Sequence, residues 1–384
     1  MSEPLPLGLG IVGCGNIFGS YITGLRKLSS IRVLGVADID QARADSVAKT
    51  HDLKAYPSPE SLLEDHAVHV VVNITPPLVH GAVALAALTR GKHVYTEKPL
   101  AASLAEADVT MEAASAASAR LGCATDTFLA GPGQGARAAL DSGLIGDPIG
   151  FAAAIPHSRA EEWHPDPTFL FTKGGGPLLD LGPYYVSNLI NCLGPVKTVA
   201  GGTRIGADPR VVTAPDRLVE SIAVGVPTHA VALLTFASGV VGTLTASFDL
   251  WSDHLPHIEI YGTRGILRLP DPDKFDGEVT FKLNTSQAWE VLPPVIELRG
   301  WSAPEGRIRG LGVADLVDSL AGRPQRTSAV LAYHVLEVLE SIELSSASEA
   351  IVHLASSPHR PEPVRPGDLG GLAVAPNDEE KAKE

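Results

Sequence analysis

Cysteines and basic residues are both scarce in this chain of 384 residues, and each scarcity argues against a class of protein. The three cysteines, Cys14, Cys123 and Cys192, are odd in number and far apart, which argues against a disulfide framework and favours reduced thiols. Lys and Arg number 30 against 44 acidic residues, giving a net charge of −14, and no basic block stands out. A protein that binds nucleic acid through its phosphates is therefore disfavoured.

Signals for export and for membrane insertion are also missing. Residues 1–7 carry Glu3 and two prolines where a signal peptide needs a basic start and an apolar core, so we expect a cytoplasmic protein. One long stretch without charge, residues 230–248, is rich in β-branched residues and has Ser238-Gly239 near its middle. This pattern predicts a β-hairpin rather than a membrane span.

The first third of the chain alternates short apolar runs with longer amphipathic segments. This order of strand, helix and strand predicts a Rossmann-type α/β domain with a doubly wound parallel sheet over residues 1–126. Helix starts are marked by Ser58 before a proline and by Ser103 three residues before Glu106. The expected strands are Leu7–Val12, Arg32–Ala37, His69–Ile74, His93–Thr96 and Gly122–Thr125.

After residue 148 the pattern changes to long alternating runs broken by glycine and proline. It predicts a second domain over residues 127–355 with a large, mostly antiparallel open sheet, which makes the chain α/β plus α+β. Helices are expected at 177–192, 310–320 and 328–341, and residues 356–384 are expected to be a mobile tail. The expected strands are Ile149–Ile155, Lys197–Thr203, Leu218–Val224, Ala230–Phe236, Val240–Phe248, His257–Tyr261, Ile266–Leu269 and Val279–Leu283.

A glycine-rich turn, Gly13-Cys14-Gly15-Asn16-Ile17-Phe18-Gly19, follows the first strand. Such a turn at a helix start lets backbone N–H groups meet a pyrophosphate, and Asp38 stands where an acid would bind the ribose hydroxyls. We therefore expect NAD, with NADP as the alternative if Arg43 faced a 2′-phosphate. Phe18 replaces the third glycine of the usual fingerprint, so helix–strand packing must differ there. The expected cofactor residues of this region are Gly13, Gly15, Asn16, Ile17 and Asp38.

Two more polar segments follow strands of the first domain. One contains Thr75, Pro76 and His80, and the other is Glu97-Lys98-Pro99. Open α/β sheets bind ligands at the carboxyl ends of their strands. We expect Thr75, Pro76, His80, Glu97 and Lys98 to contact the cofactor.

Taken together, these motifs resemble the Gfo/Idh/MocA family, named after glucose–fructose oxidoreductase, inositol dehydrogenase and a rhizopine catabolism protein. The segment from Gly174-Gly175-Gly176 through Asp180 to Tyr184 is similar to the second signature of that family, and Gly262-Thr263-Arg264-Gly265 resembles a later strand turn. The resemblance reaches about Ser341. It implies NAD(P)-dependent hydride transfer to or from a ring hydroxyl or carbonyl of a sugar, sugar derivative or cyclic polyol. It also implies a homodimer or homotetramer.

The resemblance implies catalytic roles for Lys98, Asp180 and Tyr184, and a cis peptide before Pro99. An ammonium group stabilises a developing alkoxide, and a phenol beside it can take or return the proton. Asp180 would lie on the same helix face as Tyr184, four residues away. Each residue also has an ordinary explanation: a surface charge for Lys98, a helix-start acid for Asp180, and a core aromatic for Tyr184 or Tyr185.

Residues just before the second signature would complete a substrate pocket with Lys98, Asp180 and Tyr184. Aromatic rings stack on sugar faces, although ordinary loop packing explains these residues equally well. They are Arg159, Trp163, His164 and Phe169.

No metal site is expected. His254 and His257, near Asp253, differ by three positions, which places the two on opposite faces of a strand, and no cysteine cluster accompanies them. The predicted function is that of an NAD(P)-dependent sugar or polyol dehydrogenase. Two alternatives stay open: redox-neutral glycoside cleavage through a transient keto sugar, and an NAD-binding regulator without catalysis.

Overall fold

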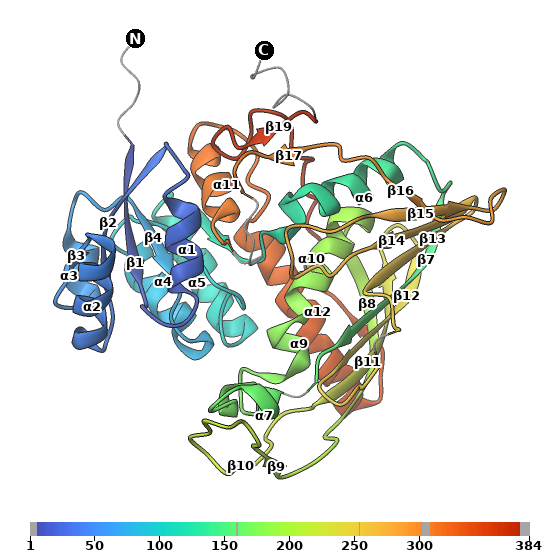
Figure 1. Cartoon of the computed structure of the whole chain (residues 1–384), viewed down its shortest axis with the longest axis horizontal. Coiled ribbons are helices and arrows are strands. Elements are labelled where there is room, and N and C mark those ends of the chain that lie inside the picture. Colours follow the sequence, from blue (N-terminus) through green and yellow to red (C-terminus); the bar gives the residue numbers. More distant parts are fainter. Residues whose placement is uncertain (1–5, 159, 253, 302–307, 377–384) are drawn as a thin grey trace. The chain divides into compact units, whose positions relative to one another are not determined.

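Two compact units make up the part of the chain that the computed structural model describes, residues 6–158, 160–252, 254–301 and 308–376 (Figure 1). The first unit contains the chain up to Ala130, the segment from Ile296 to Tyr333, and the residues from Glu362 onwards. The second unit contains Gly131–Val295 and His334–Pro361. Each unit is therefore assembled from segments that are distant in sequence.

The first unit is organised by a six-stranded sheet in which every pairing is parallel and the strand order is β3-β2-β1-β4-β5-β6. The predicted doubly wound sheet is thus confirmed. Its strands are β1 (Leu7–Val12), β2 (Ile31–Ala37), β3 (Lys54–Ala55), β4 (Val70–Asn73), β5 (His93–Thr96) and β6 (Leu121–Cys123). Its early helices are α1 (Phe18–Leu25), α2 (Gln41–His51), α3 (Pro59–Glu64), η1 (Pro77–Val79), α4 (His80–Leu88), α5 (Leu104–Ala116) and η2 (Thr127–Leu129).

Both serine-marked helix starts are observed. Ser58 and Ser61 form a reciprocal capping box at the start of α3, in which each side chain accepts from the other's main-chain N–H. Ser103 accepts from the N–H of Glu106 at 3.3 Å, whereas the Glu106 carboxylate accepts from Ala102. Only half of the second predicted box forms.

Residues 356–376, expected as part of a mobile tail, are packed against the rest of the chain. The guanidinium of Arg326 is buried and donates to the carbonyls of Glu362 and Pro363 and to the carboxylate of Asp368. A buried cation needs such partners, so these contacts hold the segment in place. Residues 377–384 lie outside the described residues. The later elements of this unit are β17 (Glu297–Leu298), α11 (Leu311–Leu320) and β19 (Ala373–Val374), and β17 pairs with β19.

A nine-stranded sheet organises the second unit, with the order β16-β15-β14-β13-β7-β12-β11-β8-β18. All neighbours in it are antiparallel except β7 and β12, which confirms the predicted large, mostly antiparallel sheet. The strands are β7 (Pro148–Pro156), β8 (Val196–Arg204), β11 (His229–Phe236), β12 (Val241–Ser247), β13 (Ile258–Gly262), β14 (Gly265–Leu269), β15 (Thr280–Leu283), β16 (Glu290–Val291) and β18 (Val352–His353). The helices are α6 (Gly131–Asp141), α7 (Ala160–Trp163), α8 (Thr168–Phe171), α9 (Gly176–Asp180), α10 (Gly182–Leu193) and α12 (Ala329–Ser348), which begins in the first unit.

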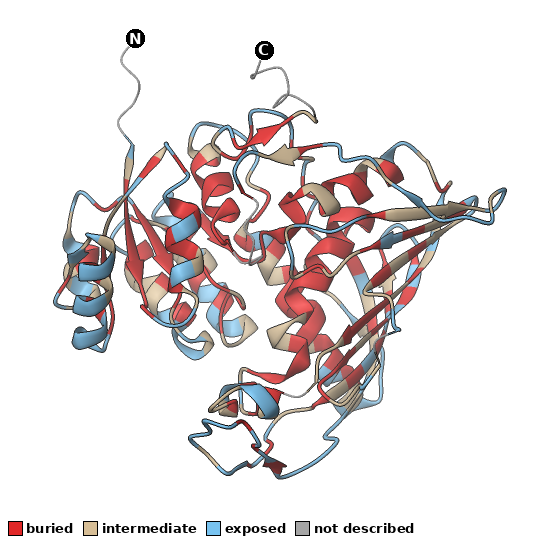
Figure 2. Cartoon of the chain, viewed as in Figure 1, coloured by how far each residue is buried: buried red, intermediate tan, exposed pale blue. Residues whose placement is uncertain are grey.

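Helices cover one face of this sheet and leave the other face uncovered by helix (Figure 1). Every residue of α10 is buried, as expected for a helix enclosed on all sides (Figure 2). On the opposite face Val231, Leu233 and Val241 remain 40–46% exposed. The uncharged stretch 230–248 forms the predicted hairpin of β11 and β12, and no helix among the described residues is long and apolar enough to cross a membrane.

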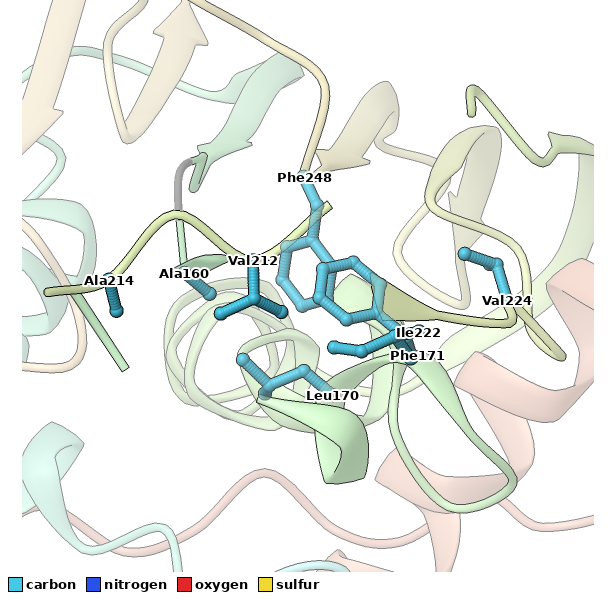
Figure 3. Close-up of a cluster of buried hydrophobic side chains, with 8 residues drawn as sticks. All are labelled: Ala160, Leu170, Phe171, Val212, Ala214, Ile222, Val224 and Phe248. Atoms are coloured by element: carbon cyan, nitrogen blue, oxygen red, sulfur yellow. The ribbon is translucent and has the colours of Figure 1, made fainter. Parts of the chain in front are cut away.

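One predicted strand is wrong. Of Leu218–Val224, only β10 (Ser221–Ile222) is a strand, and it pairs with β9 (Arg210–Val211) rather than with the large sheet. Ile222 and Val224 of this segment join a small separate core with α7 and α8 (Figure 3). We call residues 160–171 and 205–224 the satellite module. Its core consists of Ala160, Leu170, Phe171, Val212, Ala214, Ile222 and Val224, with Phe248 from the end of the hairpin.

Candidate active site

Four loops of the first unit lie together at the carboxyl edge of the parallel sheet, after β1, β2, β4 and β5. The N–H of Gly13 donates to the carbonyl of Ala37 at 2.8 Å, and the N–H of Glu97 donates to the carbonyl of Asn73 at 2.8 Å. These bonds join each loop to the end of the neighbouring strand. Because β1 lies between β2 and β4, the strand order reverses here, and open α/β sheets bind nucleotides at that point.

The glycine-rich turn has the geometry that a bound pyrophosphate requires. Gly13 has φ +104°, and a Cβ atom there would lie 2.7 Å from the carbonyl oxygen of Ile74, so no larger residue fits. Gly15 and Asn16 are exposed and Ile17 is half-buried, and a Cβ on Gly15 would contact nothing within 4 Å. The main chain at the start of α1 is therefore open to a ligand.

Phe18, which replaces the usual third glycine, is buried at the first position of α1. Its ring packs edge-on against His51 of α2, with the ring centroids 5.3 Å apart. The departure from the fingerprint thus fills space between two helices.

Asp38 is 8% exposed and accepts from two main-chain donors, Cys14 at 2.7 Å and Asp40 at 2.9 Å. Each carboxylate oxygen keeps a further lone pair for a ribose hydroxyl. The guanidinium of the half-exposed Arg43 lies 3.9 Å from Asp38 and 3.3 Å from Asp40. Burial and the charge of Asp38 raise the pKa of the Cys14 thiol to about 12, so Cys14 stays protonated.

The carboxylate of Glu97 is buried and holds the main chain of the next residue. Its Oε2 accepts from the N–H of Lys98 at 3.0 Å, and its Oε1 accepts from the hydroxyl of Tyr21 at 2.7 Å. The Lys98–Pro99 peptide is cis. Sequence analysis did not identify Tyr21, because its partner lies 76 positions away and no local pattern marks it.

His80 is buried between two loops. It is 1% exposed, with Nδ1 2.8 Å from the carbonyl of Pro99 and Nε2 2.7 Å from the carbonyl of Thr75. Both ring nitrogens are thus used to join two loops, and the side chain faces protein instead of an open surface. Thr75 is half-buried and Pro76 is exposed.

Asp180 and Tyr184 lie in the second unit, on two consecutive helices. The single helix expected over 177–192 is wrong: α9 ends at Asp180 and α10 begins at Gly182. Pro183 lacks the N–H that would donate to the carbonyl of Leu179, so the α-helical ladder breaks here. Asp180 and Tyr184 therefore do not lie on one face of a single helix, as their four-residue spacing predicts. Asp180 is half-buried and Tyr184 is 4% exposed.

Three aromatic rings form a row on the satellite module. His164 lies between Trp163 and Phe169, with ring centroids 5.5 and 5.3 Å apart. Trp163 and Phe169 are 57% and 55% exposed, which is unusual for such large apolar side chains. The row belongs to α7, α8 and their connection, and α8 contacts α9, the helix that ends at Asp180. Arg159 lies outside the described residues.

The satellite module is held by a buried arginine that sequence analysis missed. Arg210 is 7% exposed and donates to Glu161 at 2.9 Å and to Asp249, and its guanidinium lies 5.0 Å from the ring centroid of Phe171. These contacts connect α7, α8, β9 and the end of the hairpin. A lone arginine in a polar loop carries no local sign of such burial.

One of the two candidate metal-ligand histidines, His257, lies beside a tyrosine. His257 Nδ1 lies 2.6 Å from the hydroxyl of Tyr185, and Asp253 lies outside the described residues. Within the described ranges no three His, Cys, Asp or Glu side chains are grouped as a metal ion would need. Tyr185 is buried and belongs to the core.

Comparison with known proteins identifies relatives along most of the chain. Residues 7–125 match the model described as "Oxidoreductase family, NAD-binding Rossmann fold", and residues 134–268 match the "GFO/IDH/MocA C-terminal domain". Trans-1,2-dihydrobenzene-1,2-diol dehydrogenase of Bos taurus is 32% identical over 277 residues, which cover 70% of this chain and 75% of that protein. Inositol 2-dehydrogenase of Burkholderia multivorans is 31% identical, with 70% and 75% covered.

A solved structure shares the fold over nearly the whole chain. The NAD-binding oxidoreductase from Klebsiella pneumoniae superposes with a TM-score of 0.79 at 24% identity, covering 92% of this chain and 100% of that one.

Proposed function

This chain belongs to the Gfo/Idh/MocA family of NAD-binding oxidoreductases, and from that premise we propose how its own residues act. It is an NAD-dependent enzyme of the sugar and polyol dehydrogenase type. We propose that it moves a hydride between nicotinamide and a ring carbon that bears a hydroxyl or carbonyl group, in the cytoplasm. The substrate would be a sugar, a sugar derivative or a cyclic polyol.

The observation that carries this proposal is the convergence of four loops at one sheet edge. The turn at Gly13, the acid Asp38, the half-buried Thr75 and the ammonium-bearing Lys98 follow four different strands of one sheet. The backbone strain and crowding at Gly13 are tolerated only by glycine, and Asp38 keeps lone pairs for hydroxyl groups. These features fit NAD, and the anionic Asp38 would oppose a 2′-phosphate.

The chemical steps assign one role to each catalytic candidate. Bound NAD supplies the hydride acceptor or donor. Lys98 would bind the reacting oxygen and stabilise negative charge that develops on it. Tyr184 would take the hydroxyl proton during oxidation and return it during reduction, and Asp180 would orient the substrate hydroxyl.

We assign substrate contacts to the aromatic row on the satellite module. Exposed rings can cover the apolar face of a cyclic substrate, so Trp163, His164 and Phe169 would favour rings over open chains. A cyclic substrate agrees with the names of two relatives, the dihydrobenzenediol dehydrogenase and the inositol 2-dehydrogenase.

The test is nicotinamide absorbance when the purified protein and NAD or NADP are mixed with inositols, cyclic diols, aldoses and glycosides. Wild-type protein should reduce NAD with at least one ring substrate, and Lys98→Met should lower kcat by about 100-fold or more while still binding NAD. Wild-type turnover in Lys98→Met would refute the role of Lys98. Sugar release without net NADH would instead favour redox-neutral glycoside cleavage.

We also propose that the uncovered face of the nine-stranded sheet forms a homodimer or homotetramer contact. Val231, Leu233 and Val241 are exposed there on neighbouring strands, and their register places the small residues Ala152, Ala200 and Gly202 around them. Light scattering should give a multiple of the monomer mass, and Leu233→Glu should shift it towards the monomer. A monomeric wild-type protein would contradict the proposal.

A further inference from the structure

We propose that Tyr21 is a positioning residue for Lys98, acting through the carboxylate of Glu97. The inference rests on the proposed function, in which Lys98 acts on the substrate. Tyr21 belongs to α1, the helix that follows the glycine-rich turn. Two consecutive hydrogen bonds, from Tyr21 to Glu97 and from Lys98 to Glu97, connect that helix to the main chain of the lysine.

The geometry assigns one donor to each oxygen of the Glu97 carboxylate. The hydroxyl of Tyr21 donates to Oε1 at 2.7 Å, and the N–H of Lys98 donates to Oε2 at 3.0 Å. Tyr21 is fully buried and Glu97 is 6% exposed, so bulk water does not replace a lost donor. The orientation of the carboxylate therefore depends on both donors.

Removing the hydroxyl of Tyr21 would release this restraint. One oxygen of a buried carboxylate would lose its donor, and the group would rotate or take a proton. Either change weakens the hold on the N–H of Lys98. Burial and the neighbouring Glu97 raise the pKa of Tyr21 well above its usual value, so the phenol remains a donor at any working pH.

The arrangement also gives a structural reason for linking cofactor binding to lysine position. The start of α1 is the expected site of the pyrophosphate, and Tyr21 lies three positions after the first residue of the helix. The position of the helix and the position of Lys98 are then set together by one carboxylate. Tyr21 and Lys98 do not need to contact each other for this coupling, because both bind the carboxylate of Glu97.

A matched control is present in the same unit. Tyr56 is 2% exposed, and its hydroxyl donates to the carboxylate of Asp65 at 2.7 Å. Tyr56→Phe therefore removes a tyrosine–carboxylate hydrogen bond of the same length, here partly buried, on elements other than α1 and the Lys98 segment. It separates a positioning role from a general loss of stability.

The first experiment measures the reactivity of the Lys98 amine without NAD or substrate, by reductive methylation and mass spectrometry. Trypsin does not cleave before proline, so the tryptic peptide 93–120 contains Lys98 as its one lysine. Tyr21→Phe should change the methylation rate of Lys98 by about threefold or more, and Tyr56→Phe should leave it unchanged. An unchanged rate in Tyr21→Phe would overturn the proposal.

The second experiment is kinetic. In Tyr21→Phe we expect kcat to fall by about tenfold or more and its pH profile to shift, while the Kd of NAD stays within about threefold. An equal loss of kcat in Tyr56→Phe would contradict a specific role for Tyr21.

If Tyr21→Phe does not fold, Glu97→Gln provides the same methylation test, and an unchanged Lys98 rate there would also overturn the proposal. Because methylation needs no turnover, this test is independent of Lys98→Met, the test of the proposed function.

Discussion

Arg210→Met should open the satellite module while leaving the rest of the protein folded. The substitution keeps much of the side-chain length but removes the cation that pairs with Glu161 and Asp249. The side chains of Glu161 and Asp249 are only 19% and 27% exposed. The free energy that holds the module closed should therefore fall by about 2–3 kcal/mol, a value between those for breaking a surface ion pair and a fully buried one. This equals an increase of about 30- to 150-fold in local opening.

Hydrogen–deuterium exchange of residues 208–224 measures that opening. Val212, Thr213 and Ala214 donate main-chain hydrogen bonds inside the module, so their amides should exchange faster in Arg210→Met. Amides of the parallel sheet in the first unit should not change.

Arg217→Met is the matched control in the same segment. Its pair with Glu220 is exposed, at 40% and 82%, and should contribute about 0.5 kcal/mol or less. If Arg210→Met left exchange in 208–224 within about threefold of wild type, the reasoning on Arg210 would be refuted. Faster exchange across the whole protein would refute it as well.

Three further outcomes are expected. Gly13→Ala should weaken NAD binding by about tenfold or more in calorimetry, because φ +104° and the 2.7 Å approach to Ile74 strain any Cβ; unchanged affinity would contradict this. Asp38→Asn should weaken the binding of NAD by about tenfold and reduce the preference for NAD over NADP. Titration of the variant with each cofactor measures both affinities. Burial lowers the pKa of His334 to about 4, so the unfolded state binds more protons than the folded state between pH 6.5 and 4. As the pH is lowered through this range, the free energy of unfolding should therefore fall by on the order of 3 kcal/mol. In urea denaturation, the free energy of unfolding of His334→Gln should depend less on pH over that range than that of the wild type.

The strands that sequence analysis located correctly are those whose apolar residues face a large shared core. Leu7–Val12 and His93–Thr96 match β1 and β5 residue for residue, because buried parallel strands are continuous apolar runs bounded by polar turns. The hairpin at 230–248 was equally clear from its alternation and its central turn. Local pattern and tertiary structure agree in these segments.

The errors arise where a distant partner decides the structure. Leu218–Val224 has strand-like residues, but Ile222 and Val224 pack into the small core of the satellite module. The segment from 356 looked like a tail because its composition is polar and rich in proline, yet Arg326 holds its main chain. The sequence likewise does not reveal that two main-chain carbonyls lie within hydrogen-bond distance of the ring nitrogens of His80.

For the candidate site, sequence analysis supplied the residues that recur in motifs and missed those that support them. Gly13, Asp38 and Lys98 stand in recognisable positions after strands. Tyr21 and Arg210 act through contacts with residues far along the chain, and no spacing marks them.

The division of the first unit among three stretches of chain has a consequence for protein synthesis. Chains emerge from the ribosome N-terminus first, so all six strands of the parallel sheet are available early. Helix α11, which helps to complete this unit, follows residues 131–295 of the second unit. The β17–β19 pair can form only when the chain has been translated as far as Val374, after the whole second unit. The nucleotide-binding half is thus begun first and finished last, and nascent chains released before that point would carry an incomplete, aggregation-prone domain.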